Sequence, residues 1–224
     1  MLLHGLGTGP SAWIPQIEAF GAEREVVAPL LALDLDRAVR EVREIVDGEE
    51  AVDLCGLSLG ALVALRVAIE RPERVRGLVL AAGFARLPWR LRALQVLFSS
   101  AVRVLPRRVL VRGLASSVPP PYRDDAERAL ARASPAEVSR VMRAGARYDV
   151  TAAARRLDIA TLVVCGERDR HNVPLARYLA ELMPRAELRL VPDAGHVVNL
   201  EQPEAFNALL GGFLGSGEDV ALRA

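Results

Sequence analysis

The sequence contains no lysine, and all 29 of its basic residues are arginine. Schiff-base catalysis and P-loop phosphate binding both need a lysine, so both are excluded. Histidine is also scarce, with three residues, and neither Cys-x-x-Cys nor His-Glu-x-x-His occurs. We therefore expect no metal site. Arg, Gly or Pro interrupts every apolar run before membrane-spanning length, so we expect no stable membrane insertion.

Other features that the sequence lacks indicate which partners it does not attract and in which cellular compartment it is expected. The net charge is only +1, which gives no general attraction to nucleic acid. The N-terminus, MLLHGLGTGP, lacks the basic start of a signal peptide. The two cysteines, Cys55 and Cys165, each fall in a predicted buried strand with another strand between them, too far apart for a disulfide. We expect reduced thiols and a cytoplasmic protein.

Short β-type apolar runs alternate with helical patterns along the 224 residues. This alternation predicts an α/β fold with a mostly parallel sheet wrapped by helices. In the helix predicted over 36–46, Asp36 is a candidate N-cap and Gly48 follows the end. The predicted strands are Met1–Leu3, Glu25–Ala28, Ala51–Cys55, Gly77–Ala81, Thr161–Cys165 and Glu187–Val191. The predicted helices include Ser11–Phe20, Asp36–Val46, Ser58–Arg71, Pro174–Met183 and Pro203–Phe213.

One region interrupts the alternation. Residues 84–157 show amphipathic helical stretches punctuated by proline and no strand pattern, which predicts a helical lid inserted over one end of the sheet. The core is then formed by residues 1–83 and 158–215, followed by a C-terminal tail over 216–224. Between Glu73 and Asp124 there are ten arginines and no acidic residue. A solvated basic surface explains this, and so does attraction of an anionic substrate or acyl carrier.

The stretch CGLSLGA places Ser58 between a predicted strand and a predicted helix. Gly-x-Ser-x-Gly at such a junction indicates a nucleophile elbow, in which the serine adopts strained backbone angles. Gly56 and Gly60 provide room for the tight turn. A simple glycine-rich turn is the alternative interpretation.

A nucleophilic serine needs a base and an acid that orients it. His196 follows a strand and a short loop at the same end of the sheet as Ser58, which makes it the candidate base, with His171 as its rival. Asp169 follows the strand Thr161–Cys165 and is the candidate acid, with Glu167 as its rival. The chain order of serine, acid and histidine fits an elbow-type triad. Asp169 could otherwise cap a helix or turn. His4 is expected to brace its own loop by hydrogen bonding.

An oxyanion needs backbone N–H donors. Leu59, directly after the nucleophile, is one candidate, and Leu6 in HGLGTG is the other. The same loop could suggest phosphate binding, but its glycines do not form Gly-x-Gly-x-x-Gly and no acidic residue ends the second strand.

With these residues the chain resembles the α/β-hydrolase superfamily, from Met1 to about Leu214. The motifs are HGLG, CGLSLGA, RPERVRGLVLAAG, CGERD and AGHVVNLEQPEAF. The resemblance is closest to the lid-bearing group that includes carboxylesterases, the pimeloyl-carrier-protein methyl ester esterase and carbon–carbon bond hydrolases. It implies Ser58 as nucleophile, His196 as base and Asp169 as its partner, with Leu6 and Leu59 as oxyanion donors.

The chain also departs from that family. Two strands usual before the first are absent, and the loop APLLALDLD replaces a polar one, so we expect a native sheet trimmed to about six strands. We predict a serine hydrolase without cofactor that cleaves a carboxylic ester with a small to medium aliphatic acyl group. Alternatives are a thioesterase or acyl-carrier ester hydrolase, a carbon–carbon bond hydrolase or a perhydrolase. A non-catalytic binding protein of the same fold is a further alternative. A small-molecule ester is the expected partner, with an anionic acyl carrier as a second.

Overall fold

The computed structural model describes residues 1–221 and shows a five-stranded parallel sheet in the order β1-β2-β3-β4-β5. Every neighbouring pair of strands is parallel, which confirms the predicted α/β class. β2 and β4 hold the two free, buried cysteines, and β3 lies between them as expected. The strands are β1 (Leu2–Leu3), β2 (Val52–Leu57), β3 (Val75–Ala81), β4 (Ala160–Gly166) and β5 (Ala186–Val191).

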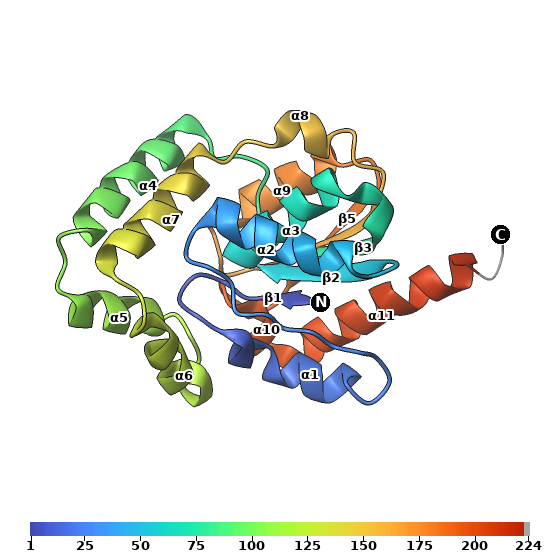
Figure 1. The fold of residues 1–224 in the computed structure, drawn as a ribbon, viewed down its shortest axis with the longest axis horizontal. Coiled ribbons are helices and arrows are strands. Elements are labelled where there is room, and N and C mark those ends of the chain that lie inside the picture. Colours follow the sequence, from blue (N-terminus) through green and yellow to red (C-terminus); the bar gives the residue numbers. More distant parts are fainter. Residues whose placement is uncertain (222–224) are drawn as a thin grey trace.

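Helices cover both faces of the sheet (Figure 1). Side chains of the central strands alternate between two cores, so that Leu54 packs on one side and Cys55 on the other. This is why the strands read as continuous apolar runs. One face carries α2 (Leu35–Asp47), α3 (Leu59–Glu70) and α9 (Val173–Leu182). The other carries η1 (Pro10–Trp13), α1 (Ile14–Phe20), α10 (Val198–Glu201) and α11 (Pro203–Ala221). The short η2 (Pro72–Arg74) leads into β3.

The ends of the helices differ slightly from the prediction. Asp34, not Asp36, caps α2, because its side chain accepts a hydrogen bond from the Arg37 N–H. Asp36 lies in the first turn and pairs with Arg66 of α3 instead. Gly48 ends the helix as expected. α11 continues to Ala221, so the expected tail is helical over 216–221, and residues 222–224 lie outside the described part.

The segment between β3 and β4 consists of five helices joined by loops (Figure 1). A single antiparallel bridge between Arg86 and Asp149 joins the two ends of this segment. We call residues 84–157 the insertion. α4 packs against α7, and a capping box of Ser134 and Glu137 fixes the start of α7. Its helices are α4 (Trp89–Val102), α5 (Arg107–Ala115), α6 (Pro120–Leu130), α7 (Pro135–Arg147) and α8 (Thr151–Ala154).

The predicted strand Glu25–Ala28 is not a strand in the structure, so the sheet has five strands instead of about six. The segment still runs beside β1, because the Leu2 N–H donates to the Val27 carbonyl at 2.8 Å. β1 is only two residues long, which leaves too few backbone groups for a regular ladder on this side.

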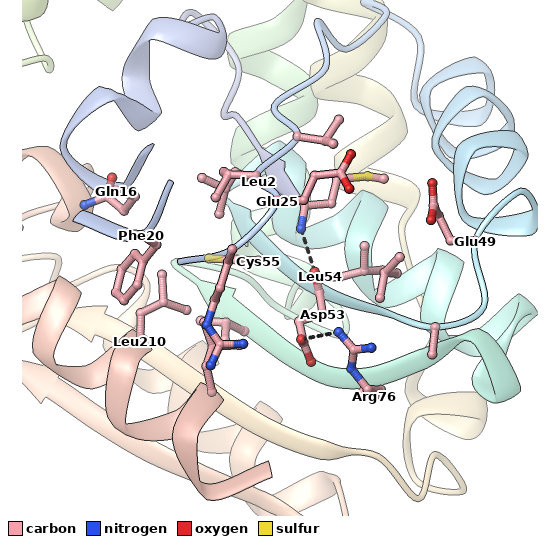
Figure 2. Close-up of a pocket in the computed structure, with 18 of the residues that line it drawn as sticks. Leu2, Gln16, Phe20, Glu25, Glu49, Asp53, Leu54, Cys55, Arg76 and Leu210 are labelled. Carbon is pink, nitrogen blue, oxygen red and sulfur yellow. Dashed lines mark hydrogen bonds and ion pairs between the residues drawn. The ribbon is translucent and has the colours of Figure 1, made fainter. Parts of the chain in front are cut away.

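A cavity of about 340 Å³ lies beside this short strand, at the edge of β2 (Figure 2). Asp53 and Arg76 form an ion pair of 2.9 Å at its border, and Phe20 and Leu210 line it from the helices. Desolvation by burial lowers the pKa of the Met1 ammonium, which donates to the Asp53 carbonyl at 2.7 Å. The candidate residues Ser58, Asp169 and His196 do not line this cavity.

Within the part of the chain that the structure describes, no helix is both long and apolar enough to cross a membrane. In the same part of the chain, no cluster of three or more His, Cys, Asp or Glu side chains could hold a metal ion.

Candidate active site

Ser58 lies in the turn between β2 and α3, as the Gly-x-Ser-x-Gly pattern predicts. Its backbone angles, φ 53° and ψ −111°, are strained for a residue with a side chain. The flanking glycines are explained by close packing. A Cβ on Gly56 would overlap the Gly60 carbonyl, and one on Gly60 would overlap the Leu3 carbonyl. The turn is therefore held against β1, with its serine at the carboxyl end of the sheet.

The side chains of Ser58, His196 and Asp169 form one hydrogen-bonded chain. His196 Nε2 lies 3.0 Å from Ser58 Oγ, and His196 Nδ1 lies 2.6 Å from Asp169 Oδ2. The three residues come from the ends of β2 and β4 and from the loop after β5, which meet because the strands are parallel. In this geometry the imidazole can accept the serine proton while the carboxylate holds the opposite nitrogen.

The environment keeps the Asp169 carboxyl ionised. Burial by itself would raise its pKa, but the hydrogen bond and charge of His196, together with hydrogen bonds from Asn172, lower the pKa below its ordinary value. The rival residues do not join this chain. The Glu167 side chain is exposed and makes no hydrogen bond to His196. His171 lines the pocket beside Ser58 that is described below, but its side chain is exposed and has no described hydrogen bond to Ser58.

Asn172 is a site residue that the sequence reasoning missed. Its Nδ2 donates to Asp169 Oδ2 at 2.8 Å and lies 3.2 Å from His196 Nδ1. Its backbone N–H also approaches Asp169 Oδ1, at 3.4 Å. The amide thus helps to hold the Asp169 carboxylate in place beside His196. The only signal in the sequence is its position three residues after the candidate acid.

Glu201 is the second residue that was missed. Its carboxylate accepts hydrogen bonds from the Gly195 N–H at 2.7 Å and from the Val197 N–H at 2.9 Å. These are the residues on either side of His196, so Glu201 of α10 clamps the histidine loop by its backbone. Its place five residues after the histidine, on a helix turn, could have suggested this role.

The candidate oxyanion donors both face the pocket. Leu6 and Leu59 belong to its lining, and Leu59 is the first residue of α3. Among the described residues, neither the Leu6 N–H nor the Leu59 N–H donates a hydrogen bond to an acceptor of the protein. Both N–H groups are therefore available to a ligand, and that of Leu59 lies at the start of α3, the end of a helix at which negative charge is stabilised.

His4 holds the loop that carries Leu6, as predicted. Its ring Nδ1 bonds the Gly5 carbonyl at 2.9 Å, and its Nε2 accepts from the Leu31 N–H at 3.0 Å. This arrangement requires a neutral imidazole with its proton on Nδ1. Burial lowers the pKa of His4, which favours that neutral form.

A pocket of about 720 Å³ opens beside Ser58 and His196. Its far wall comes from the insertion, through α4 and α7, and its floor comes from α3 and α9. Most lining side chains are apolar: Leu59, Leu62, Phe84, Leu87, Leu91, Leu94, Phe98, Val141, Met142 and Leu175. The site therefore offers a candidate nucleophile with a base, two N–H donors without a partner among the described residues, and an apolar chamber.

Similarity to known proteins identifies the family of the chain. Residues 1–209 match the profile of the alpha/beta hydrolase family. The chain belongs to this family, and it is a hydrolase. Among solved structures, an esterase from Thermogutta terrifontis superposes with a TM-score of 0.78 at 21% identity, covering 96% of this chain and 89% of the other. An enol-lactonase from Burkholderia xenovorans superposes with a TM-score of 0.76 at 19% identity, covering 96% and 90%. These two structures show the shared fold.

Curated relatives of this alpha/beta hydrolase differ in size and in name. Polyketide synthase ThaQ of Burkholderia thailandensis is 32% identical over all of this chain, but the chain spans only 12% of that protein. The putative carbamate hydrolase RutD of Azorhizobium caulinodans is 25% identical over 96% of this chain and 90% of its own length. The 3-oxoadipate enol-lactonase 2 of Acinetobacter baylyi is 25% identical over 91% and 84%.

Proposed function

We propose that this hydrolase cleaves carboxylic esters that carry a small to medium aliphatic acyl group. The observation that carries the proposal is the hydrogen-bonded chain from Ser58 through His196 to Asp169, at the mouth of an apolar pocket. The names of the relatives agree with the class: an enol-lactonase and a carbamate hydrolase both act on acyl carbonyl groups.

The proposed reaction follows from the geometry. Ser58 Oγ attacks the ester carbonyl carbon and gives its proton to His196 Nε2, 3.0 Å away. The carbonyl oxygen, now negatively charged, accepts hydrogen bonds from the N–H groups of Leu6 and Leu59. The carbon–oxygen bond to the alcohol then breaks, and His196 returns the proton to that alcohol.

The second half of the reaction releases the acid. A water molecule gives a proton to His196 Nε2 and adds to the acyl carbon, after which the bond to Ser58 Oγ breaks and the serine regains its proton. Asp169 stays ionised throughout and stabilises the imidazolium, which its lowered pKa favours. The acyl chain occupies the chamber between α3 and the insertion, whose α4 and α7 act as a lid in this proposal.

The test uses p-nitrophenyl esters of increasing acyl length. Ser58→Ala and His196→Ala should each lower turnover by at least about 10³-fold while the thermal melt is preserved. A serine-reactive fluorophosphonate should label Ser58 and should not label Ser58→Ala. Failure to label, together with absence of turnover on every ester, would favour a non-catalytic binding protein. Near-normal turnover in either variant would remove that residue from its proposed role.

A second candidate is an acyl thioester, free or on an anionic carrier. Two observations favour it: the arginines of the predicted lid, and the similarity of the chain to a small part of a polyketide synthase. With an anionic acyl thioester, kcat/KM should fall as salt rises, because screening acts over about 8–10 Å at physiological ionic strength. A neutral ester of equal acyl length should respond little. An equal salt response for both substrates would favour the esterase without an anionic carrier.

Cleavage of a carbon–carbon bond is a further alternative, and it would appear as turnover of a diketone with no turnover of esters.

A further inference from the structure

α4 and the chain that follows it into α5 carry several exposed apolar side chains. Within the described part of the chain, seven of the ten large hydrophobic side chains that are exposed belong to the insertion. We call them the apolar insertion face: Trp89, Leu94, Val96, Leu97, Phe98, Val104 and Val109. Trp89 is 74% exposed, Leu97 69% and Val104 82%. Hydrophobic patches of this kind on a protein surface mark sites of interaction.

The apolar residues of α4 lie on more than one side of the helix. Leu91 lines the pocket, and Val102 is buried in a small cluster with Leu110. Trp89, Val96 and Leu97 do not line the pocket and are exposed. Figure 1 shows α4 and α5 at one extremity of the molecule, where no other element covers their outer side.

Arginines surround the apolar insertion face without acidic partners. Arg90 and Arg92 lie in the first turn of α4, and Arg103 and Arg108 lie at the other end, around the turn into α5. All four are exposed, and among residues 1–221 none of them forms an ion pair, although Arg90 stacks on the Trp89 ring. These four arginines therefore give this face positive charge, although Arg107 beside them lies close enough to Glu137 of α7 to interact with its charge.

Both features together point to one partner. A second copy of the chain would bring arginine against arginine, which charge repulsion disfavours. A small acidic protein would satisfy the arginines but would not need seven exposed apolar side chains. An anionic lipid surface satisfies both, because arginine is attracted to the headgroups while Trp, Leu and Phe enter the acyl boundary. We propose that the insertion docks, reversibly, on an anionic lipid–water interface through this face.

The docking face is continuous with the pocket. Leu94 and Phe98 line the chamber beside Ser58, yet they are 59% and 50% exposed. They form its rim, so docking would turn the pocket mouth toward the lipid. This consequence rests on the proposed ester hydrolysis and would give the site access to apolar esters held in the interface. The docking itself does not depend on catalysis.

Trp89 provides a direct probe of docking. The chain has two tryptophans, and Trp13 is fully buried, so a change in emission on binding reports Trp89. The Ser58→Ala variant, with no proposed turnover, is mixed with vesicles of phosphatidylglycerol and phosphatidylcholine, or of phosphatidylcholine alone. We expect sedimentation with the anionic vesicles, a blue shift of the emission, and weak binding to the neutral vesicles. Absence of binding to anionic vesicles at low salt would overturn the proposal.

Variants then separate charge from apolar contact. Neutralising Arg92, Arg103 and Arg108 to Gln should weaken binding about 100-fold, at roughly fivefold per charge. Leu97→Ser with Val104→Ser, neither of which lines the pocket, should weaken it by about tenfold or more. Matched controls away from the apolar insertion face are Arg155→Gln with Arg156→Gln for charge, directly after α8 (Figure 1), and Leu30→Ser, 60% exposed, for apolar contact. Both controls should bind like the parent.

The other partners give distinct results. If Leu97→Ser with Val104→Ser leaves the affinity for anionic vesicles unchanged, the binding is nonspecific electrostatic attraction, and the proposal is overturned. The proposal would also be overturned if the protein bound an acidic acyl-carrier protein through this face but did not bind vesicles. It would be overturned as well if the protein formed a dimer that Leu97→Ser with Val104→Ser dissociated. Hydrolysis of a short p-nitrophenyl ester is measured in parallel with Ser58 restored. Loss of docking with this activity intact supports the proposal, whereas absent activity with docking intact affects only the proposed function.

Discussion

Replacing Glu201 should slow the enzyme without touching any of the three candidate catalytic side chains. The Glu201 carboxylate accepts from the N–H groups of Gly195 and Val197, at 2.7 and 2.9 Å, and so holds the backbone on both sides of His196. In Glu201→Gln the amide can accept one of these bonds, but its NH₂ would face the other N–H donor. One charge-assisted hydrogen bond is therefore lost, and the loop that carries His196 becomes more mobile.

The structure sets the size of this effect. A hydrogen bond to a charged acceptor contributes about 1.5–3 kcal/mol, and the partial exposure of this clamp favours the lower end. For a chain of this size, each kcal/mol lowers the melting temperature by roughly 2–4 °C. A displacement of His196 by about 1 Å can cost around 10²-fold in rate, so we expect kcat to fall about 10- to 100-fold. Glu201→Ala, which loses both bonds, should be more severe.

The assay compares kcat and the thermal melt for Glu201→Gln, Glu201→Ala and the control Glu204→Gln. Glu204 has the same charge and lies in the first turn of α11, but it is exposed and makes no bond to the histidine loop. Rates are measured well below each melting temperature, so that unfolding does not contribute. A lower melting temperature with unchanged kcat would show that His196 keeps its place without the clamp, and would refute the reasoning.

Three other changes probe the site and its supports. Asn172→Ala should lower kcat/KM about tenfold, because one charge-assisted hydrogen bond to Asp169 is lost. The acid side of the pH–rate profile should also move to higher pH, because that bond helps to keep the pKa of Asp169 low. An unchanged profile would contradict this. Because burial lowers the pKa of His4 in the folded state, the free energy of unfolding should fall as pH drops below about 6.5, by up to roughly 1.4 kcal/mol per pH unit, and denaturant titrations should show a flatter dependence in His4→Gln. Gly60→Ala should prevent normal folding, because its Cβ would overlap the Leu3 carbonyl, whereas Gly113→Ala, with open space around it, should melt like the parent.

Local patterns in the sequence were enough to select the candidate nucleophile and the two side chains that the structure brings into a hydrogen-bonded chain with it. The strand–Ser–helix junction requires glycines on either side of Ser58, and this steric requirement is written in adjacent residues. Asp169 and His196 could be placed because parallel strands deliver the loops after them to the same edge of the sheet. The parallel α/β fold followed from the same alternation of short apolar runs and helical patterns.

Contacts between distant segments were beyond such reasoning. The strand expected at Glu25–Ala28 has the right apolar residues, but a strand also needs a partner of sufficient length, and β1 offers two residues. The cap of α2 fell to Asp34 because Asp36 pairs with Arg66 of another helix.

The sequence by itself determined which residues are the candidate reacting groups, since this choice depends on residue type, order and local turn geometry. Only the tertiary structure decided which side chains hold them in place. Asn172 and Glu201 act through distances to atoms of other loops, and the exposure of α4 depends on which of its apolar sides meets a neighbour. Hydrogen bonds and burial are properties of pairs of segments in space, and a one-dimensional pattern cannot rank the pairings that compete for each residue.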